Sequence, residues 1–174
     1  GKNNGCAIDT SGSIHCWGRD QGQMVSQAPS TGSFISLAVA DTSACAMDAA
    51  GALQCWGDSS YGGTAPSGTF ASIHAGTYVI CGLLTNGSPE CWGANWYGQT
   101  TGLPTGAYVD MSIGDAQNCV LTSAGAVECW GHSSYITGTP TGATFSAIQS
   151  TLESNCGILD TGEVVCWGAT GDGQ

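Results

Sequence analysis

The chain has 174 residues, enough for one well-buried domain, and only 9% of them are charged. Lys2 and Arg19 are its only strong bases, and the formal net charge is −11. Because nucleic-acid binding requires clustered Lys and Arg to neutralise phosphates, this composition argues against DNA or RNA partners, and equally against an anionic membrane surface. No apolar run approaches the roughly 20 residues of a spanning helix, so membrane insertion is not expected.

Five pairs of cysteines give the chain an internal repeat. In every pair the cysteines are ten positions apart, and the second opens the tripeptide Cys-Trp-Gly. The pairs are Cys6/Cys16, Cys45/Cys55, Cys81/Cys91, Cys119/Cys129 and Cys156/Cys166. The tripeptides recur every 36 to 39 residues, a period typical of propellers and stacked repeats. We therefore expect one β-propeller domain, or a segment of one, with repeats at approximately residues 1–28, 29–65, 66–103, 104–139 and 140–174.

The cysteine pairs of each repeat are predicted to lie in a β-hairpin. A glycine follows the first cysteine by six positions in every repeat, at Gly12, Gly51, Gly87, Gly125 and Gly162. A three-residue hairpin loop favours glycine at its third position, where the backbone is left-handed. With the loop at residues 10–12, Cys6 lies opposite Cys16 in a non-hydrogen-bonded pair, with Cα atoms about 4.5 Å apart. A disulfide can bridge this distance, so we expect one inside each hairpin.

An even, regular array of ten cysteines favours disulfides, and disulfides persist in secreted and cell-surface proteins. The competing interpretation is zinc binding, but zinc motifs usually place paired ligands two to four residues apart, and here nine residues intervene. We therefore predict an extracellular protein with no metal site and no cofactor. Asn86 lies in a lone glycosylation sequon that is also an ordinary turn signal, so its glycosylation is left open.

A third strand is predicted before every hairpin except the first. It starts at an aromatic residue eleven positions before the cysteine, and a proline precedes it in the linker between blades. The aromatic residues are Phe34, Phe70, Tyr108 and Phe145, and the prolines are Pro29, Pro66, Pro104 and Pro140. Another proline, Pro89, lies on a Cys-Trp-Gly strand and indicates that this strand is a sheet edge.

Both faces of each hairpin carry apolar residues. The apolar residues that lie two places along the strand from each cysteine are on the same face as the disulfide. The tryptophan of each tripeptide points to the other face. We therefore expect every hairpin to lie between two neighbours, with these tryptophans in the core. They are Trp17, Trp56, Trp92, Trp130 and Trp167. The predicted fold class is all-β: a β-propeller of five short repeats with three principal strands per blade.

Two segments show a resemblance to a known family. They are AGTYVICGLLTNGSPECWGANWYGQ at residues 75–99 and CAIDTSGSIHCWGRDQGQ at residues 6–23. They resemble repeats of the regulator of chromosome condensation family, and the resemblance covers essentially the whole chain. It implies a β-propeller, commonly seven-bladed in that family, and the short period is closer to its compact secreted bacterial members. The cysteine pairs and the acidic composition argue against a nuclear, chromatin-bound role.

The first repeat is expected to lack its third strand, because Gly1 aligns with the residue that follows this strand in the other repeats. Two explanations remain open. Residues or repeats beyond the ends complete the ring, or a strand from another subunit fills the gap. In the second case, self-association through the open edge of the first hairpin would build a polymer or ring.

The sequence offers no sign of catalysis. His15, His74 and His132 occupy unrelated repeat positions and are interpreted as isolated polar residues. The chain has no Gly-x-Ser-x-Gly motif, and its cysteines are all expected to be paired. We therefore predict that the protein is not an enzyme.

The loops after Cys-Trp-Gly carry the candidate binding residues. Tyr61, Tyr97 and Tyr135 occupy equivalent positions, whereas Trp96 has no counterpart. The recurring tyrosines suit either packing between blades or binding, and Trp96 is the best single candidate for a contact residue. The predicted function is extracellular recognition of a protein or glycan, or scaffolding. The alternatives are a structural subunit of a filament or sheath, and a lectin.

Overall fold

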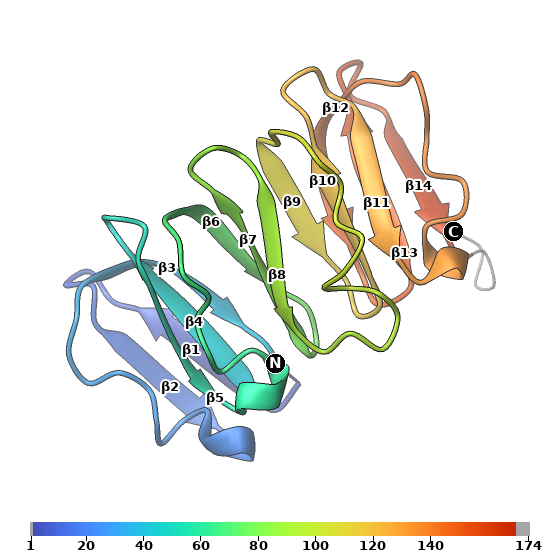
Figure 1. Cartoon of the computed structure of the whole chain (residues 1–174). Coiled ribbons are helices and arrows are strands. Elements are labelled where there is room, and N and C mark those ends of the chain that lie inside the picture. The colour runs from blue at the N-terminus through green and yellow to red at the C-terminus, as the bar shows by residue number, and fades with distance from the viewer. Residues whose placement is uncertain (1, 170–174) are drawn as a thin grey trace.

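The computed structural model describes residues 2–169 and contains five small antiparallel sheets. The elements follow one another along the chain as labelled in Figure 1. The strands are β1 (Asn4–Ile8), β2 (Ile14–Gly18), β3 (Phe34–Val39), β4 (Ser43–Asp48), β5 (Leu53–Gly57), β6 (Phe70–Ala75), β7 (Val79–Leu84), β8 (Pro89–Gly93), β9 (Asp110–Ile113), β10 (Gln117–Leu121), β11 (Val127–Gly131), β12 (Phe145–Ser150), β13 (Ser154–Leu159) and β14 (Val164–Gly168). Three short 3-10 helices are η1 (Gln21–Gln23), η2 (Ser59–Tyr61) and η3 (Ser133–Tyr135).

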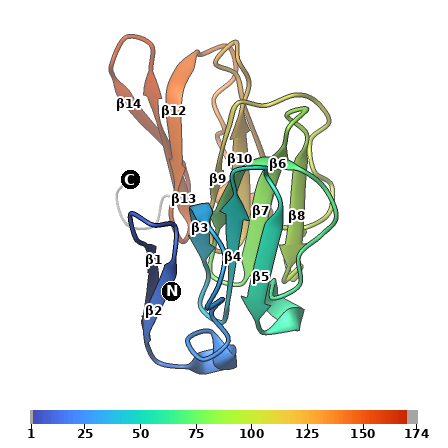
Figure 2. The same ribbon diagram turned by 90° about the vertical axis from the view of Figure 1, so that its left-hand side faces the viewer.

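Each sheet is one blade of a β-propeller, as predicted. Strands pair in chain order within β3-β4-β5, β6-β7-β8, β9-β10-β11 and β12-β13-β14, and the first sheet consists of β1 and β2. The blades form an arc with the first sheet at one end and the fifth at the other (Figure 1). Their strands run roughly along one common direction (Figure 2). The first strand of each complete blade lines a central hollow of about 420 Å³.

The predicted disulfide hairpins are confirmed in all five repeats. In each hairpin the two cysteines face each other in register, with Cα atoms 4.0–4.1 Å apart. The bonds are Cys6–Cys16, Cys45–Cys55, Cys81–Cys91, Cys119–Cys129 and Cys156–Cys166, so every cysteine in residues 2–169 is bonded. Gly12 at the third loop position has a φ of 85°, the left-handed geometry that the turn requires. The turn geometry and the disulfide therefore specify the same strand register within each hairpin.

In the second to fifth blades the two cysteines of a disulfide differ in burial, because one lies on the middle strand and the other on an edge strand. In the second and third blades the first cysteine, on the middle strand, is 0% exposed, whereas its partner on the edge strand, Cys55 or Cys91, is half-buried. In the fifth blade Cys166 on edge strand β14 is exposed. In these blades the cysteine on the middle strand is the more buried one, and the disulfide leads from it to the less buried edge strand.

The predicted third strands start at Phe34, Phe70 and Phe145 as expected. In the fourth blade the strand is shorter than predicted, because β9 begins at Asp110 and Tyr108 precedes it. The Tyr108 N–H still donates to Gly87 O at 2.9 Å, so the chain is anchored before the strand begins. The edge position predicted from Pro89 is confirmed, since β8 lies at the end of its sheet.

The core is divided among the interfaces between neighbouring blades. Each of the four hydrophobic clusters in residues 2–169 joins two consecutive sheets. In the second, third and fourth blades the tryptophan donates its indole N–H to a carbonyl at the preceding blade: Trp56 to Met24 at 2.7 Å, Trp92 to Gly62 at 3.2 Å, and Trp130 to Gln99 at 2.9 Å. The indole nitrogen of Trp167 in the fifth blade is buried without such a partner. The three hydrogen bonds fix the spacing of the blades that they join.

The expectation that all five of these tryptophans lie in the core is wrong for Trp17, which is 57% exposed. No sheet of the described residues precedes the first one, so nothing there covers its ring. Along residues 2–169, no helix has the length and apolar character needed to cross a membrane.

Candidate binding surface

Six ring side chains gather where the Cys-Trp-Gly strands end. The same end carries the three 3-10 helices, at the lower ends of their blades in Figure 1. We name this surface the aromatic rim. Its members are Tyr61, Tyr78, Trp96, Tyr97, His132 and Tyr135.

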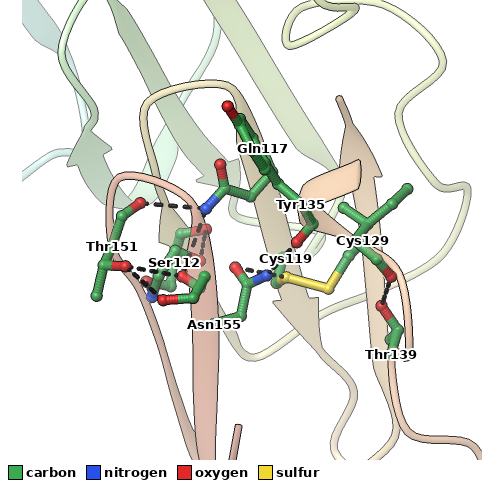
Figure 3. The surroundings of a disulfide bond; sticks show 11 residues. Ser112, Gln117, Cys119, Cys129, Tyr135, Thr139, Thr151 and Asn155 are labelled. Carbon is green, nitrogen blue, oxygen red and sulfur yellow. Dashed lines mark hydrogen bonds between the residues drawn. A yellow bond between two sulfur atoms is a disulfide. The ribbon is translucent and has the colours of Figure 1, made fainter. Parts of the chain in front are cut away.

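Tyr61 and Tyr135 are held by the two 3-10 helices with the sequence Ser-Ser-Tyr. Asp58 caps the first by accepting a hydrogen bond from the Ser60 N–H at 2.9 Å, and His132 caps the second through Nδ1. Buried Asn155 donates its side-chain N–H to Tyr135 O at 2.8 Å, beside the Cys119–Cys129 disulfide (Figure 3). The Ser43 hydroxyl on β4 donates to Tyr61 O, so both loops are attached to the sheets.

The loop that carries Trp96 and Tyr97 is anchored by Gln99, whose side chain is 1% exposed. The Gln99 Oε1 accepts from the Tyr97 N–H at 2.9 Å, and Nε2 donates to Asp115 O at 3.2 Å. The Gln99 carbonyl accepts from both the Asn118 side chain and the Trp130 indole. This loop is therefore fastened to the fourth blade, and its conformation is set before any ligand arrives.

One half of the rim is a cluster of three rings. The Trp96 ring centroid lies 5.7 Å from that of Tyr61 and 5.5 Å from that of Tyr78, in edge-to-face geometry. Tyr61 and Tyr78 are themselves 5.3 Å apart. Aromatic pairs favour such geometry, so the three rings support one another. Trp96 nevertheless remains 59% exposed.

The other half of the rim is a row of three rings. Tyr97 contacts His132 edge-on at 5.0 Å, and His132 stacks on Tyr135 at 4.6 Å. Because His132 Nδ1 accepts the Ser134 N–H, the proton of the neutral imidazole lies on Nε2. Trp96 and Tyr97 are adjacent in sequence, so the two halves meet at this dipeptide and the rim spans the second, third and fourth blades.

The structure brings all four sequence candidates into one surface. Tyr97 and Trp96 are exposed, whereas Tyr61 and Tyr135 are half-buried. Sequence reasoning missed Tyr78, which lies on a different loop, and it treated His132 as isolated although its ring stacks on Tyr135. One signal was available for His132, since it precedes Ser-Ser-Tyr at the position that Asp58 occupies two repeats earlier.

The disulfide cysteines lie on the strands beneath the rim loops and are not part of the aromatic rim. Cys55, Cys91, Cys129 and Cys166 lie on the strands that lead into the loops at this end, two residues before the glycine that closes each strand. Because each is bonded to its hairpin partner, none offers a thiol for catalysis or metal binding. Their role in the site is to hold the strand ends in place.

Carboxylates border the rim on the side of the central hollow. Desolvation, followed by the nearby carboxylate of Glu153, raises the pKa of Tyr135, and Asp115 adds to the effect. The Asp41 N–H donates to Thr77 O at 2.9 Å, which places Asp41 next to the loop of Tyr78. A cavity of about 430 Å³ opens at this end, with Asp41, Asp115 and Lys2 in its lining. The rim therefore lies in an acidic environment.

The remaining histidines do not join it. His15 pairs with Asp9 at 2.8 Å near the opposite end of the first hairpin. His74 lines the central hollow, where its Nε2 is buried without a hydrogen-bond partner, and desolvation lowers its pKa despite the nearby Asp110. Between residues 2 and 169, no three His, Cys, Asp or Glu side chains gather as a metal ion would require.

Comparison with solved structures supports the predicted repeat family at the level of the fold. The ectodomain of the Physcomitrella patens receptor kinase CR4 is 28% identical, with a TM-score of 0.82, over 98% of this chain and 51% of that chain. The CRINKLY WD40 ectodomain of the Arabidopsis thaliana receptor kinase ACR4 is 24% identical, with a TM-score of 0.77, over 95% of this chain and 60% of that chain. Prp20p from Saccharomyces cerevisiae, also described as yeast RCC1, is 15% identical, with a TM-score of 0.77, over 95% of this chain and 56% of that chain.

The chain thus spans between half and three fifths of the length of these proteins. No protein-family model matches the sequence, and a comparison with curated proteins finds no significant match. The similarity to yeast RCC1 (Prp20) and to the receptor ectodomains confirms the resemblance to regulator of chromosome condensation repeats as a likeness of architecture.

Proposed function

We propose that this protein is an extracellular, non-catalytic β-propeller that recognises a protein partner through the aromatic rim. The observation that carries the proposal is the exposed Trp96–Tyr97 pair on a loop fastened by buried Gln99. Large aromatic side chains on a pre-organised surface are the usual energetic centres of protein interfaces.

Two observations support the extracellular setting. Five hairpin disulfides are typical of proteins that function outside the cytosol. The architecture is also shared with two receptor-kinase ectodomains. A non-catalytic role accords with cysteines that are all bonded and with histidines that lie in three separate places.

A protein partner suits the shape of the rim better than a sugar. Lectin sites commonly stack one flat ring face on a sugar, whereas here two tyrosines contact Trp96 and the rings extend across three blades. Rings distributed over three blades offer several contact points to one partner, as the aromatic anchors of protein interfaces do.

The test compares two exposed tryptophans. Trp96 and Trp17 are 59% and 57% exposed, so Trp96→Ala and Trp17→Ala remove similar surface from different places. Proteins captured from the extracellular fraction of the source by the wild type should also be captured by Trp17→Ala and should be lost with Trp96→Ala, while the melting curves of both variants still show a folded protein. Equal capture by all three contradicts the proposal. Glycan-array binding that depends on Trp96 would replace it with the lectin alternative.

A second candidate is the structural subunit, favoured by the two-stranded first sheet. Among the described strands, β1 pairs with β2 alone, whereas its counterparts β4, β7, β10 and β13 each pair on both sides. A strand from another chain added to this edge would complete the blade. Negative-stain microscopy of the concentrated full protein tests this, since fibres support it and dispersed single particles exclude it.

A further inference from the structure

The charges around the aromatic rim restrict the chemistry of its partner. The protein has 13 Asp and Glu residues against two Lys and Arg. Asp41, Asp115 and Glu153 lie in the loops that join the first two strands of the second, fourth and fifth blades. These loops are on the side of the rim that faces the central hollow. An acidic partner surface would meet repulsion here, whereas a basic one would be attracted.

The position of two carboxylates relative to the rings is defined by their neighbours. Gly168 lies against the carbonyl oxygens of both Tyr135 and Glu153, and the Ala169 N–H donates to Glu153 O at 3.1 Å. Asp115 O accepts the Gln99 hydrogen bond that fastens the Trp96–Tyr97 loop. The loop of Asp115 therefore meets the loop of Trp96 and Tyr97, and the loop of Glu153 lies next to that of Tyr135.

Exposed aromatic rings add an attraction for the same type of ligand. The face of an indole attracts guanidinium and ammonium groups, and tryptophan is the strongest of the aromatic side chains in this respect. Arginine can also lay its planar group on an aromatic ring while it donates hydrogen bonds to a carboxylate. Trp96 and Tyr97 supply exposed rings, and half-buried Asp115 and exposed Glu153 supply the acceptors.

Lys2 is the strong base that lines this end of the hollow, against two carboxylates, Asp41 and Asp115, in the same lining. Its backbone N–H donates to Asp41 Oδ1 at 2.7 Å, so this residue is associated with the carboxylate farthest along the arc from Glu153. The carboxylates next to Tyr135 have no Lys or Arg among the ion pairs of the described residues.

We infer that the partner docks through an arginine- or lysine-rich segment. One cationic side chain lies against Trp96 and Tyr97, and the next lies between Asp115 and Glu153. This inference rests on the proposed function and specifies the class of its ligand.

The probe is capped hexa-arginine peptide, with capped hexa-citrulline as the neutral isostere, and the readout is titration calorimetry on the full protein. Two double variants change the net charge equally. Asp115→Asn with Glu153→Gln alters the rim, whereas Asp160→Asn with Glu163→Gln alters the β13–β14 turn at the opposite end of the fifth blade. We expect at least 5-fold weaker hexa-arginine binding for the rim pair and for Trp96→Ala, and less than 2-fold for the turn pair and Trp17→Ala.

Three results overturn the inference: no hexa-arginine binding by the wild type, equal weakening by both double variants, or equal binding of the citrulline peptide. The equal-weakening result means that net charge alone attracts the probe. If Trp96→Ala abolishes capture of the natural partner while hexa-arginine binds all variants alike, recognition through the rim stands and its basic ligand does not. Melting curves of all four variants show whether each is folded.

Discussion

Trp130 and Trp17 occupy the same position of the repeat in very different surroundings. Trp130 is 6% exposed and donates its indole N–H to Gln99 O of the third blade, whereas Trp17 is 57% exposed. Their hairpins are alike, with the same register and the same disulfide. Within residues 2–169 the difference follows from the neighbouring sheet, since a blade packs on Trp130 and none of the described sheets packs on Trp17.

The fifth blade shows the same contrast on its disulfide face. Val164 is 66% exposed, whereas its counterpart Val127 is 8% exposed beneath the fifth blade. Cys166 is exposed on the same face. A hairpin thus forms through local interactions, but its hydrophobic faces stabilise the fold only where two blades meet. The free energy of unfolding in this architecture is therefore approximately a sum of contributions from the hairpins and from the interfaces between neighbouring blades.

The largest expected effect distinguishes the two tryptophans. Trp130→Ala removes a buried ring and leaves the Gln99 carbonyl with one hydrogen bond fewer, so the free energy of unfolding should fall by about 3–5 kcal/mol. Trp17→Ala should cost less than about 1 kcal/mol, because its ring is mostly in water. Guanidinium denaturation measures both, and similar losses would contradict the comparison.

Removal of the first and of the fourth disulfide should lower the free energy of unfolding by more similar amounts, because the chain-entropy part of the loss is the same in both hairpins. Replacing both cysteines by alanine should cost about 3 kcal/mol at most through chain entropy at Cys6–Cys16 and equally at Cys119–Cys129, since both bridges span ten positions. The second pair should cost about 1 kcal/mol more, because Cys119 is buried between two blades and alanine leaves a space. Denaturation of the two double variants tests the order, and a larger loss at Cys6–Cys16 would reverse it.

The smallest expected effect concerns two histidines. Desolvation lowers the pKa of His74 in the folded state, so below the ordinary value of 6.5 the unfolded chain binds the proton more readily. Stability should therefore decline as pH falls through this value. His74→Gln should remove that part of the decline, while His15→Gln, at an exposed site, should retain it. Melting temperatures at pH 7.5 and 5.5 measure the difference, and an unchanged pH dependence in His74→Gln would disprove it.

Most of the fold was predictable because its determinants repeat. The spacing of Cys6 and Cys16 around Gly12 specifies a turn, a register and a bridge within one hairpin, and each can be derived from eleven residues. The edge position of Pro89 follows from its missing N–H. The exposure of Trp17 could not be derived in this way, because it depends on which sheet lies next to it.

The candidate surface was predictable only in part. The recurring tyrosines and the unmatched Trp96 are visible in the loops of the sequence. The contact of Tyr78 with Trp96 and the hydrogen bond from Gln99 to Asp115 O each join residues from different loops, and periodicity does not specify those distances. Sequence thus indicates candidates, and the packing of blades decides which of them share a surface.

The most direct test of the account is hydroxyl-radical footprinting of Trp96 and Trp17 in one sample, with and without the captured partner. The two rings are almost equally exposed, so their oxidation rates in the free protein should be similar. Binding through the aromatic rim predicts that the partner slows oxidation of Trp96 several-fold and leaves Trp17 unchanged. Protection of Trp17 with Trp96 still reactive would show that the protein binds through another surface.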